Sequence, residues 1–181
     1  MTPNKIFFFL FSLVLCIFPH ANAAVSLVGK VCERTHSKAN CIASLASNRD
    51  SKTANIEQLG LIALKLAAEN ATHTTLHIKQ LLNNRSTWDP TTEQALSDCY
   101  DQYVDANTQL ADAGAALLVK DNRNVYVWVS AAIANAKTCE DGFKQNSVAG
   151  KDSILTQKNA IFRQLCNNVL AIVKFMNNKK H

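Results

Sequence analysis

Residues 125–143 read VYVWVSAAIANAKTCEDGF, and this stretch decides the fold class. The valines at 125, 127 and 129 alternate as a β-strand would, but the alanine-rich continuation from Ala131 favours a helix. Side chains that fit a core recur at spacings of three and four, which places them on one face of an α-helix. They are Val125, Val129, Ala132, Ala136, Cys139 and Phe143.

The same period appears before and after this stretch, which predicts four long helices. Asp89 followed by Pro90 is typical of a helix start, Asp121 and Asn122 mark a turn, and Gly150 with Asp152 breaks the chain again. We call the apolar face of each helix its seam. The seams comprise Leu64, Ala67, Ala71, Thr75, Ile78 and Leu82 in a helix over about 53–83; Leu96, Cys99, Tyr103, Ala106, Leu110, Ala113 and Leu117 in the next; and Phe162, Leu165, Val169, Ile172 and Met176 in the last.

Short breaks between long amphipathic helices predict an all-α fold with an up-down-up-down four-helix bundle. We expect this bundle to span residues 51–178 and to follow a short helical hairpin at residues 24–50. No segment alternates with period two for long enough to form a sheet.

The cysteine positions agree with this arrangement. Cys32 and Cys41 are close enough in sequence to pinch the hairpin. Cys99 and Cys139 lie 22 residues before and 18 residues after Asp121, so the two cysteines come within about 6 Å of each other along the bundle axis. We therefore prefer the disulfides Cys32–Cys41 and Cys99–Cys139 over the other pairings of four cysteines, with Cys166 as a buried free thiol.

The N-terminus predicts secretion. Lys5 precedes an apolar run over residues 6–18, and Ala21-Asn22-Ala23 supplies small residues for cleavage. We expect a signal peptide at residues 1–23 and a mature domain at residues 24–181. The apolar run is too short to span a bilayer, and no later segment is comparable, so no membrane association is expected after cleavage.

Composition argues against several chemistries. The whole chain carries a net charge of +5 with scattered basic residues, which does not favour nucleic-acid binding. The five glycines are isolated and form no phosphate-binding loop. Glu69, His73 and His77 share a helix face, but no further ligand cluster accompanies them, so a solvated face is preferred over a metal site. We expect no catalytic residue, cofactor or metal.

Two pairs of carboxylates could in principle do acid/base chemistry, but we expect both to be charged helix surface: Asp98 with Asp101, and Glu140 with Asp141. Two sequons, at Asn70 and Asn84, are candidate N-glycosylation sites, with Asn84 sterically favoured by its place in a loop.

The positions of the two tryptophans in the chain predict different exposures. We expect Trp128 to lie in the core or at the bundle end, and Trp88 to be the better candidate for an exposed contact.

Several motifs resemble the plant invertase and pectin methylesterase inhibitor family. They are Cys32-Glu33-Arg34-Thr35, Cys41 with Leu45 four residues on, Trp128-Val129-Ser130-Ala131-Ala132, and Cys139-Glu140-Asp141-Gly142-Phe143. The last motif is also similar to the pollen-allergen branch, whose members are often labelled invertase inhibitors. The resemblance covers the mature chain and implies a secreted plant glycoprotein of the apoplast or cell wall, with the vacuole as alternative, that blocks a carbohydrate-active enzyme.

The target within this family is a separate prediction. Invertase-directed members carry a Pro-Lys-Phe turn between the second and third bundle helices, where this chain has Asn122-Arg123-Asn124. The missing proline and phenylalanine favour pectin methylesterase as the target, with acid invertase second, and we take this turn as the candidate target contact. Alternatives from other classes are a small-ligand-binding bundle and a hydrolase with an unrecognised acid pair. We expect a monomeric, stand-alone inhibitor that is not an enzyme.

Overall fold

The computed structural model describes residues 26–84, 88–146 and 153–178, which contain helices and no strand. The predicted signal peptide at residues 1–23, the expected chain break at Gly150 and Asp152, and residues 85 and 86 of the Asn84 sequon lie outside these described residues.

The described part of the chain begins with the predicted helical hairpin. Helix α2 (Leu27–Cys32) is capped by Ser26, whose side chain accepts a hydrogen bond from the Gly29 amide. Helix α3 (Lys38–Ala46) follows, and a 3₁₀ turn, η1 (Arg49–Lys52), leads to the bundle. The Cys32–Cys41 disulfide joins the two hairpin helices with their Cα atoms 5.6 Å apart, which confirms the first predicted pairing.

Helix α4 (Ile56–Asn83) opens the bundle. It begins three residues later than the sequence predicts, because Asn55 and Gln58 form a capping box. The Asn55 side chain accepts from the Gln58 amide, and the Gln58 side chain accepts from the Asn55 amide, so two otherwise unpaired donors at the helix start are satisfied.

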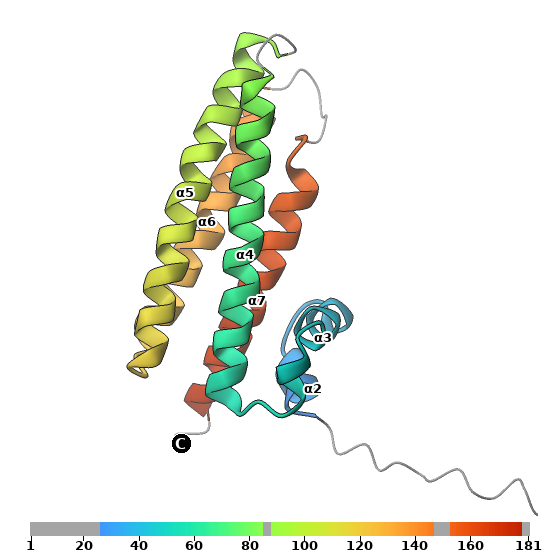
Figure 1. Cartoon of the computed structure of the whole chain (residues 1–181), viewed down its shortest axis with the longest axis vertical. Coiled ribbons are helices and arrows are strands. Elements are labelled where there is room, and N and C mark those ends of the chain that lie inside the picture. Colours follow the sequence, from blue (N-terminus) through green and yellow to red (C-terminus); the bar gives the residue numbers. More distant parts are fainter. Residues whose placement is uncertain (1–25, 85–87, 147–152, 179–181) are drawn as a thin grey trace, which may run out of the picture.

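Three further helices complete the predicted bundle: α5 (Pro90–Leu118), α6 (Asn122–Asn146) and α7 (Thr156–Asn178). Asp89 caps α5 as predicted, accepting from the amides of Thr91 and Thr92. Figure 1 shows the four long helices side by side in up-down-up-down order. The α5–α6 connection, the C-terminal end of α7 and the hairpin lie at one end of the bundle, and the α4–α5 connection lies at the other.

The core is formed by the predicted seams. Tyr103 and Phe162 are fully buried, and their ring centroids lie 5.3 Å apart. Of the predicted seam residues, only Thr75, Leu82 and Leu165 are half-buried rather than buried. The seam packing is tight near the lower end of α4, where a Cβ atom added at Gly60 would lie 3.0 Å from Leu117.

The second disulfide joins α5 to α6. Cys99 and Cys139 have Cα atoms 4.7 Å apart, in agreement with the axial-rise argument. Cys166 is buried and free, which confirms the third cysteine prediction.

The hairpin packs mainly against α7. Asn168 Nδ2 donates a 2.9 Å hydrogen bond to Ser44 Oγ, and the Arg34 guanidinium lies 5.6 Å from the centroid of the Phe175 ring. Buried Val31 and Leu45 supply apolar contact. The hairpin therefore places the α2–α3 connection beside the C-terminal end of α7.

Candidate functional site

The end of the bundle where α5 meets α6 has a backbone geometry set by Lys120. This residue has a φ of 60°, the left-handed conformation that usually favours glycine. Its amide donates to the Leu117 carbonyl and the Asp121 amide donates to the Ala116 carbonyl, which is a Schellman termination of α5. Asp121 Oδ1 then accepts from the Asn124 amide and caps α6, so the two helices are joined through a tight connection.

The predicted contact turn Asn122-Arg123-Asn124 is the first turn of α6 rather than a loop. Asp121 makes it helical by capping the segment. Arg123 and Asn124 are exposed, whereas Asn122 is buried and donates a 2.8 Å hydrogen bond to Asn177 on α7. Only two of the three predicted contact residues can therefore reach a partner directly.

Apolar side chains surround this connection on the outside. Leu118 and Val119 are 71% and 76% exposed, and Tyr126 and Val127 are also exposed on the first turns of α6. We call Leu118, Val119, Arg123, Tyr126 and Val127 the bundle tip. Exposed apolar residues gathered at one end of a small domain are typical of a protein-contact surface.

A groove adjoins the bundle tip and shares Arg123, Tyr126 and Val127 with it. It lies between the α2–α3 connection, the start of α6 and the C-terminal half of α7, and its volume is about 1090 Å³. Arg34, Lys120, Arg123 and Lys174 line it, and Asp121 is its one acidic lining residue. Both Asp121 oxygens accept hydrogen bonds from Asn124, through its amide and its side chain. The groove therefore presents a net positive charge.

Sequence reasoning missed the groove and the apolar tip. The signal for the tip was present, because Leu118 and Val119 directly follow the seam residue Leu117 and lie off the seam. The groove combines residues from three distant segments, so no local pattern indicates it.

Trp128 is 37% exposed and so does not lie in the core, but its place on the second turn of α6 agrees with the predicted position at the bundle end. The prediction for Trp88 was wrong. Trp88 is half-buried against the core, and its indole nitrogen donates a 2.9 Å hydrogen bond to the Leu81 carbonyl. This bond holds the residues just before α5 against the end of α4, so Trp88 is not an exposed contact residue.

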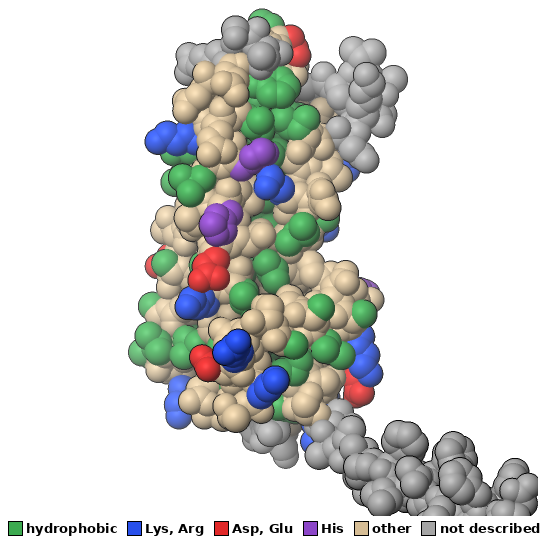
Figure 2. Space-filling view, turned by 45° about the vertical axis from the view of Figure 1, so that its right-hand side comes forward, with side chains coloured by type: hydrophobic (Ala, Val, Ile, Leu, Met, Phe, Trp, Pro, Cys, Tyr) green, Lys and Arg blue, Asp and Glu red, His purple; other side chains and the backbone are tan. Residues whose placement is uncertain are grey.

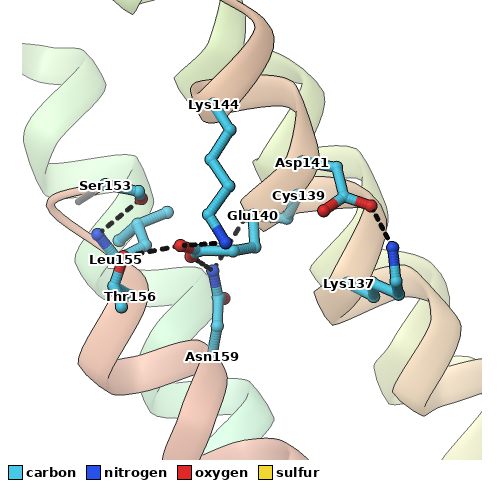
Figure 3. A network of polar contacts seen from close by, with 9 residues as sticks. All are labelled: Lys137, Cys139, Glu140, Asp141, Lys144, Ser153, Leu155, Thr156 and Asn159. Atoms are coloured by element: carbon cyan, nitrogen blue, oxygen red, sulfur yellow. Dashed lines mark hydrogen bonds and ion pairs between the residues drawn. The ribbon is translucent and has the colours of Figure 1, made fainter. Parts of the chain in front are cut away.

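Glu140 was interpreted as helix surface, and the structure corrects this. Glu140 is only 6% exposed. Its two carboxylate oxygens accept hydrogen bonds from Thr156 Oγ1 at 2.7 Å and from Asn159 Nδ2 at 2.8 Å (Figure 3). Lys144 lies 3.6 Å from the same carboxylate. Tyr103 Oη completes the network by donating to Asn159 Oδ1 at 2.8 Å. These bonds join α5, α6 and α7, so the arrangement is that of a structural tie.

Asp141, beside Glu140 in the sequence, has a different environment. It points away from this network and forms an ion pair with Lys137 one turn earlier (Figure 3). The hydrogen bond from Lys137 lowers the pKa of Asp141. Asp98 and Asp101 are both exposed on α5, in agreement with their interpretation as helix surface.

His73 and His77 lie one turn apart on α4, with His73 exposed and His77 half-buried. Figure 2 shows histidine, basic and acidic side chains scattered over one face of the molecule. Burial, followed by the nearby Lys158 on α7, lowers the pKa of His77. Glu69 on the same face pairs with Lys65. Across residues 26–84, 88–146 and 153–178, no group of three or more metal-ligating side chains comes together.

The two sequons differ in environment. Asn70 lies inside α4, and its Oδ1 atom is buried without a hydrogen-bond partner. Asn84 is exposed at the C-terminal cap of α4, at the end of the bundle opposite the tip. The geometry therefore favours Asn84 over Asn70 as an acceptor.

Within the described ranges, no helix is both long and apolar enough to cross a membrane. The molecule is a disulfide-linked helical bundle with an exposed apolar tip and a basic groove. These features are typical of a binding module.

Comparison with known proteins identifies the family. Residues 26–172 match the family described as Plant invertase/pectin methylesterase inhibitor. A Platanus acerifolia protein named "Putative invertase inhibitor" is 33% identical over 94% of both chains. A "Pectinesterase inhibitor" from Actinidia deliciosa is 28% identical over 90% of this chain and 85% of its own.

Solved structures agree with the sequence comparison. The crystal structure of mutant form A of a pectin methylesterase inhibitor from Arabidopsis aligns with a TM-score of 0.70 and 26% identity, covering 82% of this chain and 96% of that one. This chain belongs to the plant invertase/pectin methylesterase inhibitor family, as the sequence motifs indicated.

Proposed function

We propose that this protein is a secreted inhibitor of plant pectin methylesterase. The observation that carries this proposal is the structural match to a pectin methylesterase inhibitor over 96% of that chain, at 26% identity. The pectinesterase-inhibitor names of further relatives support it. Acid invertase is the second candidate target, because two relatives above 30% identity carry an invertase-inhibitor name.

The proposed mechanism is steric. The bundle tip docks over the substrate cleft of the enzyme and excludes the polysaccharide, and the inhibitor performs no chemistry. A standard interface buries roughly 1,600 Å² in total, which a tip together with neighbouring helix surface can supply. Tyr126 and Arg123 are residue types that often dominate binding energy, and Leu118 and Val119 supply exposed apolar area.

Secretion is part of the proposal. The N-terminal leader predicted at residues 1–23 would direct the chain out of the cell, and the two disulfides are typical of an oxidising compartment. We place the protein in the apoplast or cell wall, where pectin methylesterase acts on its substrate, and we propose that it acts as a monomer.

The experiment mixes the oxidised protein, residues 24–181, separately with plant pectin methylesterase and acid invertase between about pH 5 and 7. We expect inhibition of the first enzyme at micromolar concentration or below. Inhibition of invertase alone would select the second target, and inhibition of neither would show the proposed function to be wrong.

A matched pair of variants tests the contact surface. The double variant Leu118→Ser with Val119→Ser should weaken inhibition by about tenfold or more, because it removes exposed apolar contact. Leu76→Ser makes a similar change at an exposed position in the C-terminal third of α4, away from the tip, and serves as the control. If only the α4 variant loses inhibition, the enzyme binds another face.

A further inference from the structure

The groove beside the bundle tip concentrates positive charge that the fold does not neutralise. Arg34, Lys120, Arg123 and Lys174 all line it. Among the described residues, none of the four pairs with a carboxylate within salt-bridge distance. Asp121 is the acidic residue in the groove lining, and its hydrogen bonds come from the neutral Asn124, so the four cations outnumber one carboxylate. A groove with these properties favours an anionic occupant.

The fold holds these cations at defined places. Arg34 is positioned by its contact with the Phe175 ring, which anchors the guanidinium at the hairpin wall. Lys120 occupies a left-handed backbone position that a glycine would adopt with less strain. Lys174 lies on α7, opposite the start of α6. The four cationic side chains therefore come from three separate segments and line the same groove.

The uncharged lining indicates what kind of anion fits. Asn167, Asn177 and Asn178 contribute amide groups, which can hydrogen-bond to hydroxyls, and exposed Tyr126 contributes an aromatic face. Cations, amides and an aromatic ring together suit an acidic sugar better than a simple acidic peptide. The groove volume of about 1090 Å³ slightly exceeds the usual range of roughly 300–1,000 Å³ for one small ligand, which fits several linked units.

We infer that this groove binds a linear polyuronate, the carboxylate-bearing polymer that remains when the methyl esters of pectin are hydrolysed. The inference rests on the proposed function, because that function brings the protein to an enzyme that generates this polymer. Binding here would retain the inhibitor on pectin that has already been de-esterified. The ligand is the product of the target's reaction. The groove shares Arg123 and Tyr126 with the bundle tip, whereas Leu118 and Val119 belong to the tip and do not line the groove.

The test measures binding of a fluorescently labelled oligogalacturonate of about ten units by anisotropy, with no enzyme present and at low ionic strength. Affinity should fall as salt is added, because the contacts are exposed charges. The double variant Arg34→Ala with Lys174→Ala should weaken binding roughly five- to tenfold, as expected for losing two exposed ion pairs. Lys79→Ala, which removes one exposed charge near the other end of the bundle, should change it less than twofold.

A second variant separates charge from folding. Lys120→Gly removes one groove charge but relieves the backbone strain, so it should weaken oligogalacturonate binding while the protein becomes no less stable. Weaker binding in a destabilised protein could reflect unfolding, and weaker binding in this variant could not.

Three results would overturn the inference. They are no binding at low salt, equal binding of the fully methyl-esterified oligomer, and equal binding of a polyglutamate peptide with the same sensitivity to the variants. Inhibition assays on the same proteins keep the two proposals apart. Inhibition without oligogalacturonate binding would support the proposed function and contradict the groove inference. Oligogalacturonate binding without inhibition would support the groove inference and contradict the proposed function.

Discussion

Asn159 on α7 donates from Nδ2 to the Glu140 carboxylate on α6 at 2.8 Å, while its Oδ1 accepts from Tyr103 on α5. A single buried amide thus links three of the four bundle helices. The same Nδ2 also lies 3.7 Å from Cys139 Sγ, so the polar tie and the α5–α6 disulfide meet at one level of the bundle. The motif Cys139-Glu140 therefore contributes a covalent and a polar link from adjacent positions.

Replacing Glu140 by alanine should destabilise the fold by about 2–3 kcal/mol, because Asn159 Nδ2 and Thr156 Oγ1 would lose their acceptor in a buried site. Glu140→Gln keeps one acceptor and the side-chain volume, and it should cost less than half as much. Urea denaturation of the oxidised proteins measures both. Equal stability of the alanine variant and the natural protein would show that the network contributes nothing.

The free thiol of Cys166 should be unreactive in the folded protein. Burial raises the pKa of this thiol, so little thiolate forms at neutral pH, and reagents also cannot reach it. Alkylation at pH 8 should therefore be slow and should accelerate across the same urea range in which the fold is lost. Rapid modification in native buffer would contradict the buried position.

The helices and disulfides were predictable from sequence because both follow from local spacing. Apolar residues three and four apart define a helix face, and a fixed rise per residue brings Cys99 and Cys139 to the same level. Trp128 lies three residues after Val125 and four before Ala132, so the helical period places it at the edge of the buried face. Its exposed fraction of 37% depends on how the neighbouring helices pack, which the period does not indicate.

Other features depend on which helices are neighbours. Glu140 lies four residues after Ala136 and three before Phe143, so the helical period places it at the edge of the buried face of α6. The α7 side chains that satisfy its carboxylate are set by the neighbouring helix and cannot be read from α6. The groove requires the hairpin to dock on α7, which brings Arg34 near Lys174 across more than a hundred residues of sequence. Such long-range placement is a property of the assembled fold.

Stability should depend on pH through His77. Its folded pKa lies below the ordinary value of 6.5, because burial and Lys158 disfavour the charged ring. The unfolded chain therefore binds this proton more readily, so the contribution is fully present above about pH 6.5 and is lost as the pH falls through the folded pKa. His77→Gln should reduce the drop in denaturation midpoint between pH 8 and 5.

The control for this measurement is His73→Gln, which changes the exposed histidine one turn earlier on α4. It should leave the pH dependence in place. An unchanged drop in the His77 variant would assign the acid sensitivity to another group.

Glycosylation should occur at Asn84 when the chain is made in a eukaryotic secretory pathway. Asn84 is exposed at the end of α4, whereas Asn70 has its side-chain oxygen buried within the helix. Asn84→Gln should remove an enzymatically cleavable mass shift, and Asn70→Gln should not. A shift that depends on Asn70 would mean that modification precedes formation of α4.

Lys120→Gly should stabilise the fold by about 1 kcal/mol, because a side chain at a φ of 60° is strained and glycine is not. Lys120→Ala is the matched control, since it removes the same charge but keeps a Cβ atom in the strained position. The free energies of unfolding of the two variants separate the effect of backbone strain from the effect of losing the charge. If both are equally stable, the Schellman connection stores no strain at this residue. A stabilised glycine variant would show that the chain retains lysine here at a cost in stability, which is the pattern expected of a residue that serves binding.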